Sequence, residues 1–261
     1  MGIQVIGGAG ASTSKNFQTV FINSTQTWTS PANVSQIEIL LVGGGGAGGG
    51  VINWSQGLGG GGGGGGVVVQ TLTVTPSTAY TVTIGAGGAR STGDANGGAG
   101  GNSTFGSLAT AFGGGGGMGL NGAGQAMPAG GSGGGGATNG TSVGAGGGGG
   151  AVAMAGTRNF ISPALQNQPG SATSNTQPWH TSGGTAYLGL YGGGGGGAMN
   201  WSTSQQGPWH LGGNNAGRGS RDNGTATAGV ANFGGGGGGG CQSFAFPENG
   251  GSGVCIISYW S

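Results

Sequence analysis

Two short motifs, each present twice, carry the side chains of this sequence that are best suited to binding chemistry. An Asn-Trp-Ser motif lies at residues 53–55 and 200–202, and a Pro-Trp-His motif lies at residues 178–180 and 208–210. A tryptophan presents a large rigid ring and one N–H donor at a low cost in side-chain entropy, which suits a recognition surface. Asn, Gln, Ser and Thr are abundant around these motifs and supply adaptable hydrogen-bonding partners. The motifs therefore favour a protein that recognises a binding partner through its loops.

Each tryptophan also has a plainer interpretation, because an indole in a glycine-rich chain can fill space against bare backbone. For Trp54 and Trp201 the two interpretations weigh equally. For Trp179 and Trp209 the neighbouring proline and histidine favour a displayed turn.

Metal binding and catalysis have little support in the sequence. His180 and His210 have no Cys, Asp or Glu close by, and two ligands fall short of a zinc site. Glycoside hydrolysis needs two carboxylates at one bond, and Asp94, Asp222 and Glu248 show no sign of convergence. The glycine runs match nucleotide-binding patterns only trivially, since no helical segment follows them. We therefore expect no enzyme activity, no metal and no cofactor.

The few charged residues leave two interpretations open. Arg158, Arg218 and Arg221 with Asp222 fall in long segments between glycine runs, where they could pair with acidic sugars or phosphates. Solvated loop charges are the more usual explanation.

Composition excludes several classes of function. Of 261 residues, 78 are glycine and 8 are proline, while 5 basic and 4 acidic residues give a net charge of +1. A nucleic-acid-binding surface needs a larger field of Lys and Arg. No apolar run approaches the roughly 20 residues of a membrane span, and the first residues lack the pattern of a cleaved signal peptide. We expect no nucleic-acid partner, no membrane insertion and no export by such a signal. Cys241 and Cys255 can pair or stay thiols, and we favour thiols.

The elements that must position the motifs are strands and glycine runs. Runs rich in β-branched and aromatic residues predict strands, and no stretch has a helical period. The predicted strands are 17–22, 34–42, 67–75, 79–84 and 254–260. Trp28 and Trp260 lie in strand contexts and are expected in the core.

Eight uninterrupted glycine runs of similar length suggest a repeated structural element. They are 43–46, 48–50, 59–66, 113–117, 133–136, 146–150, 192–197 and 234–240. The candidate is the polyproline II conformation, which has three residues per turn and makes no internal hydrogen bonds. Such helices must bond sideways, and only glycine lets their backbones approach closely. A lattice of these polyglycine II helices is expected, although the same runs are also compatible with β-arches.

The expected organisation has three parts. Residues 1–42 form N-terminal strands and an attachment segment, 43–253 form the glycine lattice with inserted strands at 67–84, and 254–261 form a closing strand. The segments between glycine runs become loops displayed at the ends of the lattice. These display loops are 51–58, 118–132, 151–191 and 198–233.

The first part of the chain resembles a known family. The residues that carry the resemblance are 17–50, with Trp-Thr-x-Pro before a strand and a glycine burst; 72–88, with a TP-x-x-x-Y-x-V strand; and 97–106, with a G-x-S-x-F-G close. Across about residues 17–117 this pattern resembles the glycine-rich domain of bacteriophage tail-fibre and receptor-binding proteins. The later alternation of glycine runs with aromatic loops is similar in style to the polyglycine sandwich of the fibre-tip adhesins of T-even-type phages.

The resemblance implies a non-enzymatic adhesin of a phage tail fibre that recognises a bacterial outer-membrane protein or surface glycan. It also implies assembly in the host cytoplasm into the virion, with other virion subunits or copies of itself, such as a homotrimer, as further partners. The candidate receptor-binding residues are Trp54, Arg158, Phe160, Trp179, His180, Tyr187, Tyr191, Trp201, Trp209, His210 and Arg218.

A rival interpretation is a structural protein, either a capsid decoration or the subunit of a filament, in which the aromatic loops fill subunit contacts. An ice-binding protein would need a flat, regular face, which the irregular loop lengths disfavour.

Overall fold

The computed structural model describes eleven strands and, within the described residues, no helix. The described residues are 16–51, 58–120, 152–155, 178–180, 186–188, 191–198, 212, 215–220, 225–240 and 246–261, of which 152–155, 178–180 and 186–188 are described by their backbone alone. The expected β-rich fold without α-helix is confirmed for this part of the chain.

Nine of the strands form two antiparallel or mixed sheets. In chain order the strands are β1 (Phe17–Ile22), β2 (Gln26–Thr29), β3 (Gln36–Val42), β4 (Val67–Thr73), β5 (Ala79–Thr83), β6 (Ser103–Phe105), β7 (Ala109–Ala111), β8 (Val152–Ala155), β9 (Pro178–His180), β10 (Ala186–Leu188) and β11 (Val254–Trp260). The first sheet has the order β1-β11-β3-β4-β8, and the second has the order β2-β5-β6-β7. All pairs are antiparallel except β4 with β8, which is parallel. β9 and β10 form a separate two-stranded hairpin.

The strand predictions are confirmed for β1 and β11, which have the expected bounds, and for β3, β4 and β5, which are shorter by one or two residues. The remaining strands have only three or four residues. Such short segments carry too few alternating positions for a period of two to stand out.

Apolar side chains from both sheets meet in one core. Phe105, in the middle of this core, is fully buried, and Trp28 is 8% exposed. The indole of Trp28 lies with its centroid 5.9 Å from the rings of Phe105 and Tyr259. The core position predicted for Trp28 is therefore confirmed. The core position predicted for Trp260 is wrong: its side chain is 51% exposed, because it alternates with Tyr259 and so points to the outer face of the first sheet.

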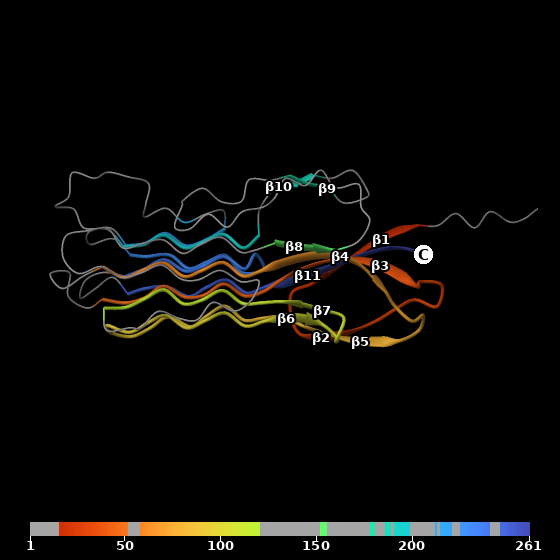
Figure 1. The fold of residues 1–261 in the computed structure, drawn as a ribbon, viewed down its shortest axis with the longest axis horizontal. Helices are drawn as coiled ribbons and strands as arrows, with labels where there is room; N and C mark the ends of the chain where they lie inside the picture. The colour runs from red at the N-terminus through yellow and green to blue at the C-terminus, as the bar shows by residue number, and fades with distance from the viewer. Residues whose placement is uncertain are drawn as a thin grey trace, which may run out of the picture.

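The chain leaves the strands in extended segments that we call the glycine bundle. Figure 1 shows these segments running side by side from the sheets to the opposite end of the molecule, while the C-terminus lies at the sheet end. In the described residues the bundle comprises 43–50, 59–66, 85–89, 95–102, 112–119, 192–198, 215–220, 225–230, 234–240 and 247–253. We call the end of the bundle away from the sheets the far end.

Backbone donors of segment 43–50 change partner with a period of three residues. Gly43, Gly46 and Gly49 donate to carbonyls of segment 59–66 at 2.8 to 2.9 Å. Segment 95–102 accepts the second set of bonds, in which Gly44 donates to Gly101, Ala47 to Gly98 and Gly50 to Ala95. Segment 247–253 accepts the third set, in which Gly45 donates to Gly251 and Gly48 to Glu248. A strand would instead alternate between two neighbours.

The same segment accepts hydrogen bonds from three further segments. Carbonyls of segment 43–50 accept N–H groups from 85–89, 112–119 and 234–240. Segment 43–50 is thus bonded to six neighbours on all sides. Segment 234–240 is likewise bonded to six neighbours: 43–50, 59–66, 192–198, 215–220, 225–230 and 247–253.

Close approach is what requires glycine in the bundle. A Cβ added at Gly46 would overlap the carbonyl of Gly115, and one at Gly45 would overlap the carbonyl of Gly235. Both obstacles are backbone atoms, which no side-chain rotation can move. Gly234 is a different case, because its φ of 65° lies in the left-handed region that favours glycine.

Candidate functional site

The described residues contain no group of three His, Cys, Asp or Glu side chains that could hold a metal ion. In the same part of the chain, no helix has the length and hydropathy to cross a membrane. The chemistry of the described surface therefore has to be sought in smaller groups of polar and aromatic side chains.

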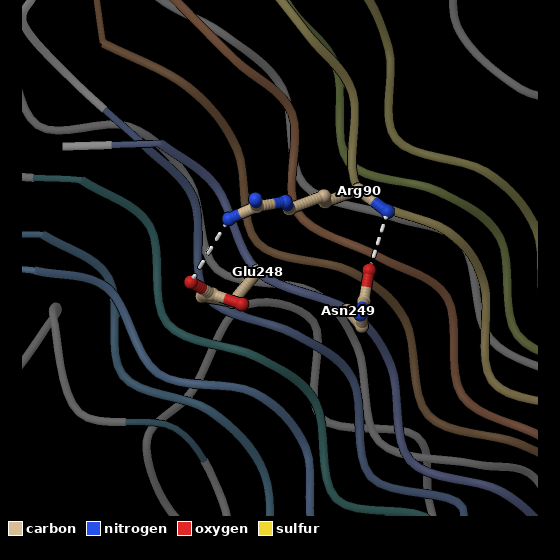
Figure 2. A network of polar contacts seen from close by, with 3 residues as sticks. All are labelled: Arg90, Glu248 and Asn249. Carbon is tan, nitrogen blue, oxygen red and sulfur yellow. Dashed lines mark hydrogen bonds and ion pairs between the residues drawn. The ribbon is translucent and has the colours of Figure 1, made fainter. Parts of the chain in front are cut away.

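One such group joins Arg90, which follows segment 85–89, to residues of segment 247–253 (Figure 2). The backbone N–H of Arg90 donates to the Asn249 Oδ1 at 2.7 Å. The guanidinium Nη1 of Arg90 lies 3.4 Å from the Glu248 Oε1. Its Cζ lies 5.8 Å from the centroid of the Phe246 ring. We call Arg90, Phe246, Glu248 and Asn249 the arginine cluster.

The arginine cluster is accessible. The side chain of Phe246 is 50% exposed and that of Arg90 is 49% exposed. An exposed ion pair contributes roughly 0–1 kcal/mol, and an exposed cation–π contact about as much. The cluster therefore adds little to stability. What it provides is a half-exposed aromatic ring with a cation and neutral or acidic acceptors beside it, an arrangement that can stack on a ligand and hydrogen-bond to it.

The structure joins the two chain segments that flank the Asn-Trp-Ser motifs. Leu58 follows the first motif and Ala198 precedes the second, and these two fully buried residues form one hydrophobic cluster. The N–H of Ala198 donates to the carbonyl of Gly59 at 3.0 Å. Trp54 and Trp201 themselves lie outside the described residues.

Three predicted site residues lie on the β9–β10 hairpin. Trp179 is in register with Tyr187, and His180 is in register with Ala186. The backbone thus brings together candidates that the sequence separates. The second Pro-Trp-His motif, with Trp209 and His210, and the candidates Arg158 and Phe160 lie outside the described residues.

The structure describes the side chains of two other candidates, Tyr191 and Arg218. Tyr191 is 7% exposed and stacks on Phe233, with ring centroids 5.4 Å apart, against Val42 and Val254 at the base of the bundle. This burial removes Tyr191 from a surface site. Arg218 is exposed, and its backbone N–H donates to the Thr227 Oγ1 at 2.8 Å.

Sequence reasoning missed the arginine cluster. Arg90 and Glu248 are 158 positions apart, so no local pattern joins them. A usable signal did exist, because the segment CQSFAFPEN stands between a glycine run and the closing strand and carries two phenylalanines. Its composition resembles that of the display loops.

Fold and site together define a two-sheet β structure that carries a hydrogen-bonded glycine bundle with polar and aromatic groups towards its far end. A family model for a glycine-rich domain matches residues 18–260. The chain therefore belongs to this glycine-rich domain family. No curated protein matches the chain.

Proposed function

We propose that this protein is an adhesin of a bacteriophage tail fibre, which recognises a bacterial surface receptor through aromatic and polar loops on a glycine scaffold. The observation that carries the proposal is the difference between the two ends of the molecule. Asn16 and Ser261 are hydrogen-bonded to each other at the sheet end, whereas the arginine cluster and the residues flanking the Asn-Trp-Ser motifs lie towards the far end (Figure 1). This arrangement suits attachment at the sheet end and recognition by the far end, with the β9–β10 hairpin, which Figure 1 shows near β8, as a second recognition element along the molecule.

The scaffold in this proposal is a lattice of polyglycine II helices. The three-residue period of the donors in segment 43–50 supports it, because a helix with three residues per turn directs successive N–H groups to three different neighbours. The six bonded neighbours of segment 234–240 support it further. A scaffold of this kind fixes the stems of its loops, so that loop side chains lose little further entropy on binding.

Recognition in this proposal comes from aromatic anchors within a rim of neutral polar groups. The anchors are Trp179 and Tyr187 on the β9–β10 hairpin, Trp209 in the second Pro-Trp-His motif, and Trp54 and Trp201, whose flanking residues Leu58 and Ala198 pack together. The low charge of the chain favours a receptor read by stacking and hydrogen bonds over one read by charge. An outer-membrane protein or a neutral surface glycan fits this requirement.

The test measures binding of the labelled full-length protein to susceptible bacteria. Combined Trp179→Ala and Trp209→Ala substitutions are expected to abolish cell binding and to leave the unfolding transition in place. Leu108→Ala is the control, because this 42% exposed side chain lies in the β6–β7 turn at the sheet end. Undiminished binding by the double variant would refute the assignment of these anchors.

A second function, the subunit of a filament or a capsid decoration, is favoured by one observation. β1 is an edge strand of the first sheet and carries the exposed side chains of Phe17 and Phe21. Exposed edges of this kind pair with other chains. Electron microscopy of the purified protein separates the two functions: discrete particles that coat cells support the adhesin, and long filaments without cell binding support the structural protein.

A further inference from the structure

Among the described residues, no segment is hydrogen-bonded to the outer edge of β1. Asn16 and Ser261 exchange two hydrogen bonds, at 2.8 and 3.0 Å. In an antiparallel pair such exchanges recur at every second residue. The bonds between β1 and β11 therefore fall at residues 16, 18, 20 and 22 of β1. Phe17, Thr19 and Phe21 consequently direct their N–H and C=O groups to the open side.

The side chains of the same three residues cover the outer face of the first sheet. Val20 and Ile22 belong to the core between the sheets, so Phe17, Thr19 and Phe21 point away from it. Phe21 is 53% exposed, and Phe17 stacks on the half-exposed Trp260 with ring centroids 5.0 Å apart. An open edge and an exposed aromatic face thus coincide on one strand.

The outward-facing residues of β1 are symmetric about Thr19, with a phenylalanine two residues to either side. A two-fold axis through Thr19 would pair this strand antiparallel with its own copy. Thr19 would then face Thr19 of the copy, and each Phe17 would face a Phe21. All three outward residues would form bonded pairs, and aromatic cross-strand pairs stabilise a sheet.

Charge is also compatible with such self-pairing. A two-fold axis places like groups near like groups, so any charge on the strand would be repelled by its copy. β1 contains no charged residue, and neither do Ile256, Ser258 and Trp260, which continue the outer face on β11.

We propose that two copies of this chain associate through β1, antiparallel and in register about Thr19, to form one continuous sheet across the dimer. The contact is isologous and closes on itself, so it yields a dimer and no filament. The glycine bundles and their far ends stay outside the contact. The proposal does not rest on the adhesin function.

The experiment measures the mass of the full-length protein by sedimentation over a range of concentrations. The wild-type chain is expected to reach twice its mass of 24.2 kDa. Phe17→Lys and Phe21→Glu are each expected to raise the dissociation constant about tenfold or more, because each change removes two aromatic pairs from the dimer. The combination F17K/F21E is expected to restore association to within about threefold, since the register places position 17 opposite position 21.

Backbone pairing has its own test. Thr19→Pro removes an outward N–H, which an edge strand tolerates, together with the 3.4 Å hydrogen bond between the hydroxyls of Thr19 and Ser258, and it is expected to abolish the dimer while the fold survives. Val20→Pro is the contrasting control, because it removes a bond to β11 and is expected to destabilise the fold itself. A chain that stays at 24.2 kDa up to its solubility limit overturns the proposal. Three other results also overturn the proposal. The mass grows without limit as the concentration rises, Thr19→Pro leaves the dimer intact, or F17K/F21E does not restore association.

Discussion

Gly100→Ala is expected to destabilise the protein, whereas Gly101→Ala is expected to leave its stability almost unchanged. The two glycines are neighbours in segment 95–102 and are buried to a similar degree. A Cβ at Gly100 would overlap the carbonyl of Gly44, whereas a Cβ at Gly101 would lie 3.1 Å from its nearest atom, the nitrogen of Ala86. Neither position has a positive φ, so backbone strain does not distinguish them.

The magnitude follows from the hydrogen bonds around Gly44. Moving segment 95–102 away from Gly44 disturbs three bonds of 2.8 to 2.9 Å, which join Gly44 to Gly101, Gly100 to Gly114, and Gly101 to Ala86. At about 1 kcal/mol each, their loss costs about 3 kcal/mol. Alanine also lowers the conformational entropy of the unfolded chain, which raises the free energy of unfolding by about 0.4–1 kcal/mol. The net loss for Gly100→Ala is about 2 kcal/mol. At Gly101 the neighbouring backbone has to shift by only a few tenths of an ångström to admit the methyl group. The small cost of this shift nearly cancels the gain from restricting the unfolded chain.

The assay is thermal unfolding of the wild type and both variants under one set of conditions. A loss of about 2 kcal/mol lowers the midpoint of a chain of this size by roughly 4–8 °C. Equal losses in the two variants would refute the close-approach argument, because the sites differ only in what the new methyl group meets. Two unchanged midpoints would refute it as well, since the bundle would then have room for side chains.

Three further predictions concern the sheets. Ser103→Ala is expected to lower the free energy of unfolding by about 2–4 kcal/mol in denaturant titrations, because its buried hydroxyl donates to the Val42 carbonyl at 2.6 Å and accepts the Gly85 N–H at 2.9 Å; the exposed Thr110→Ala should have little effect. Trp28→Ala is expected to cost about 3–5 kcal/mol in the same titrations, as expected for loss of a buried aromatic ring. Burial raises the pKa of the Cys255 thiol from 9.0 to about 12, so the folded state holds this proton more tightly than the unfolded state. Stability is therefore expected to fall by about 1 kcal/mol per pH unit as the pH rises from about 9 towards 12, and Cys255→Ala should remove this slope.

Local patterns in the sequence predicted the elements whose residues determine their own structure. β1 and β11 follow from runs of β-branched and aromatic residues, and the glycine runs follow from their composition. The sequence did not predict which segments of the bundle are hydrogen-bonded to each other. Nothing local specifies that Gly43 bonds to Gly66 while Gly44 bonds to Gly101, because glycines carry no side chains to distinguish one neighbour from another.

The exposure of Trp260 and the burial of Tyr191 show a second limit of sequence reasoning. Trp260 is the last residue of β11 and Tyr191 precedes the glycine run 192–197. Both elements were correctly recognised, but the environment of each residue depends on which face another part of the chain covers. Phe233 covers Tyr191 from a turn 42 positions later, whereas β1, beside Trp260, is the edge of its sheet. The arginine cluster depends in the same way on the meeting of two distant segments.

The change from strand to bundle at Val42 and Gly43 explains why recognition chemistry must lie outside the bundle. A strand bonds to neighbours on two sides and keeps two faces for side chains, as Leu41 and Leu40 illustrate in β3. From Gly43 onward the central segment is bonded to backbones on six sides, and the only side chain these backbones accommodate in it is the buried methyl group of Ala47. A segment enclosed in this way can carry no binding residues of its own. Side chains able to contact a ligand are thereby restricted to the outer segments and the connections between segments, where Arg90 and Phe246 lie, and substitutions there should alter recognition without altering the bundle.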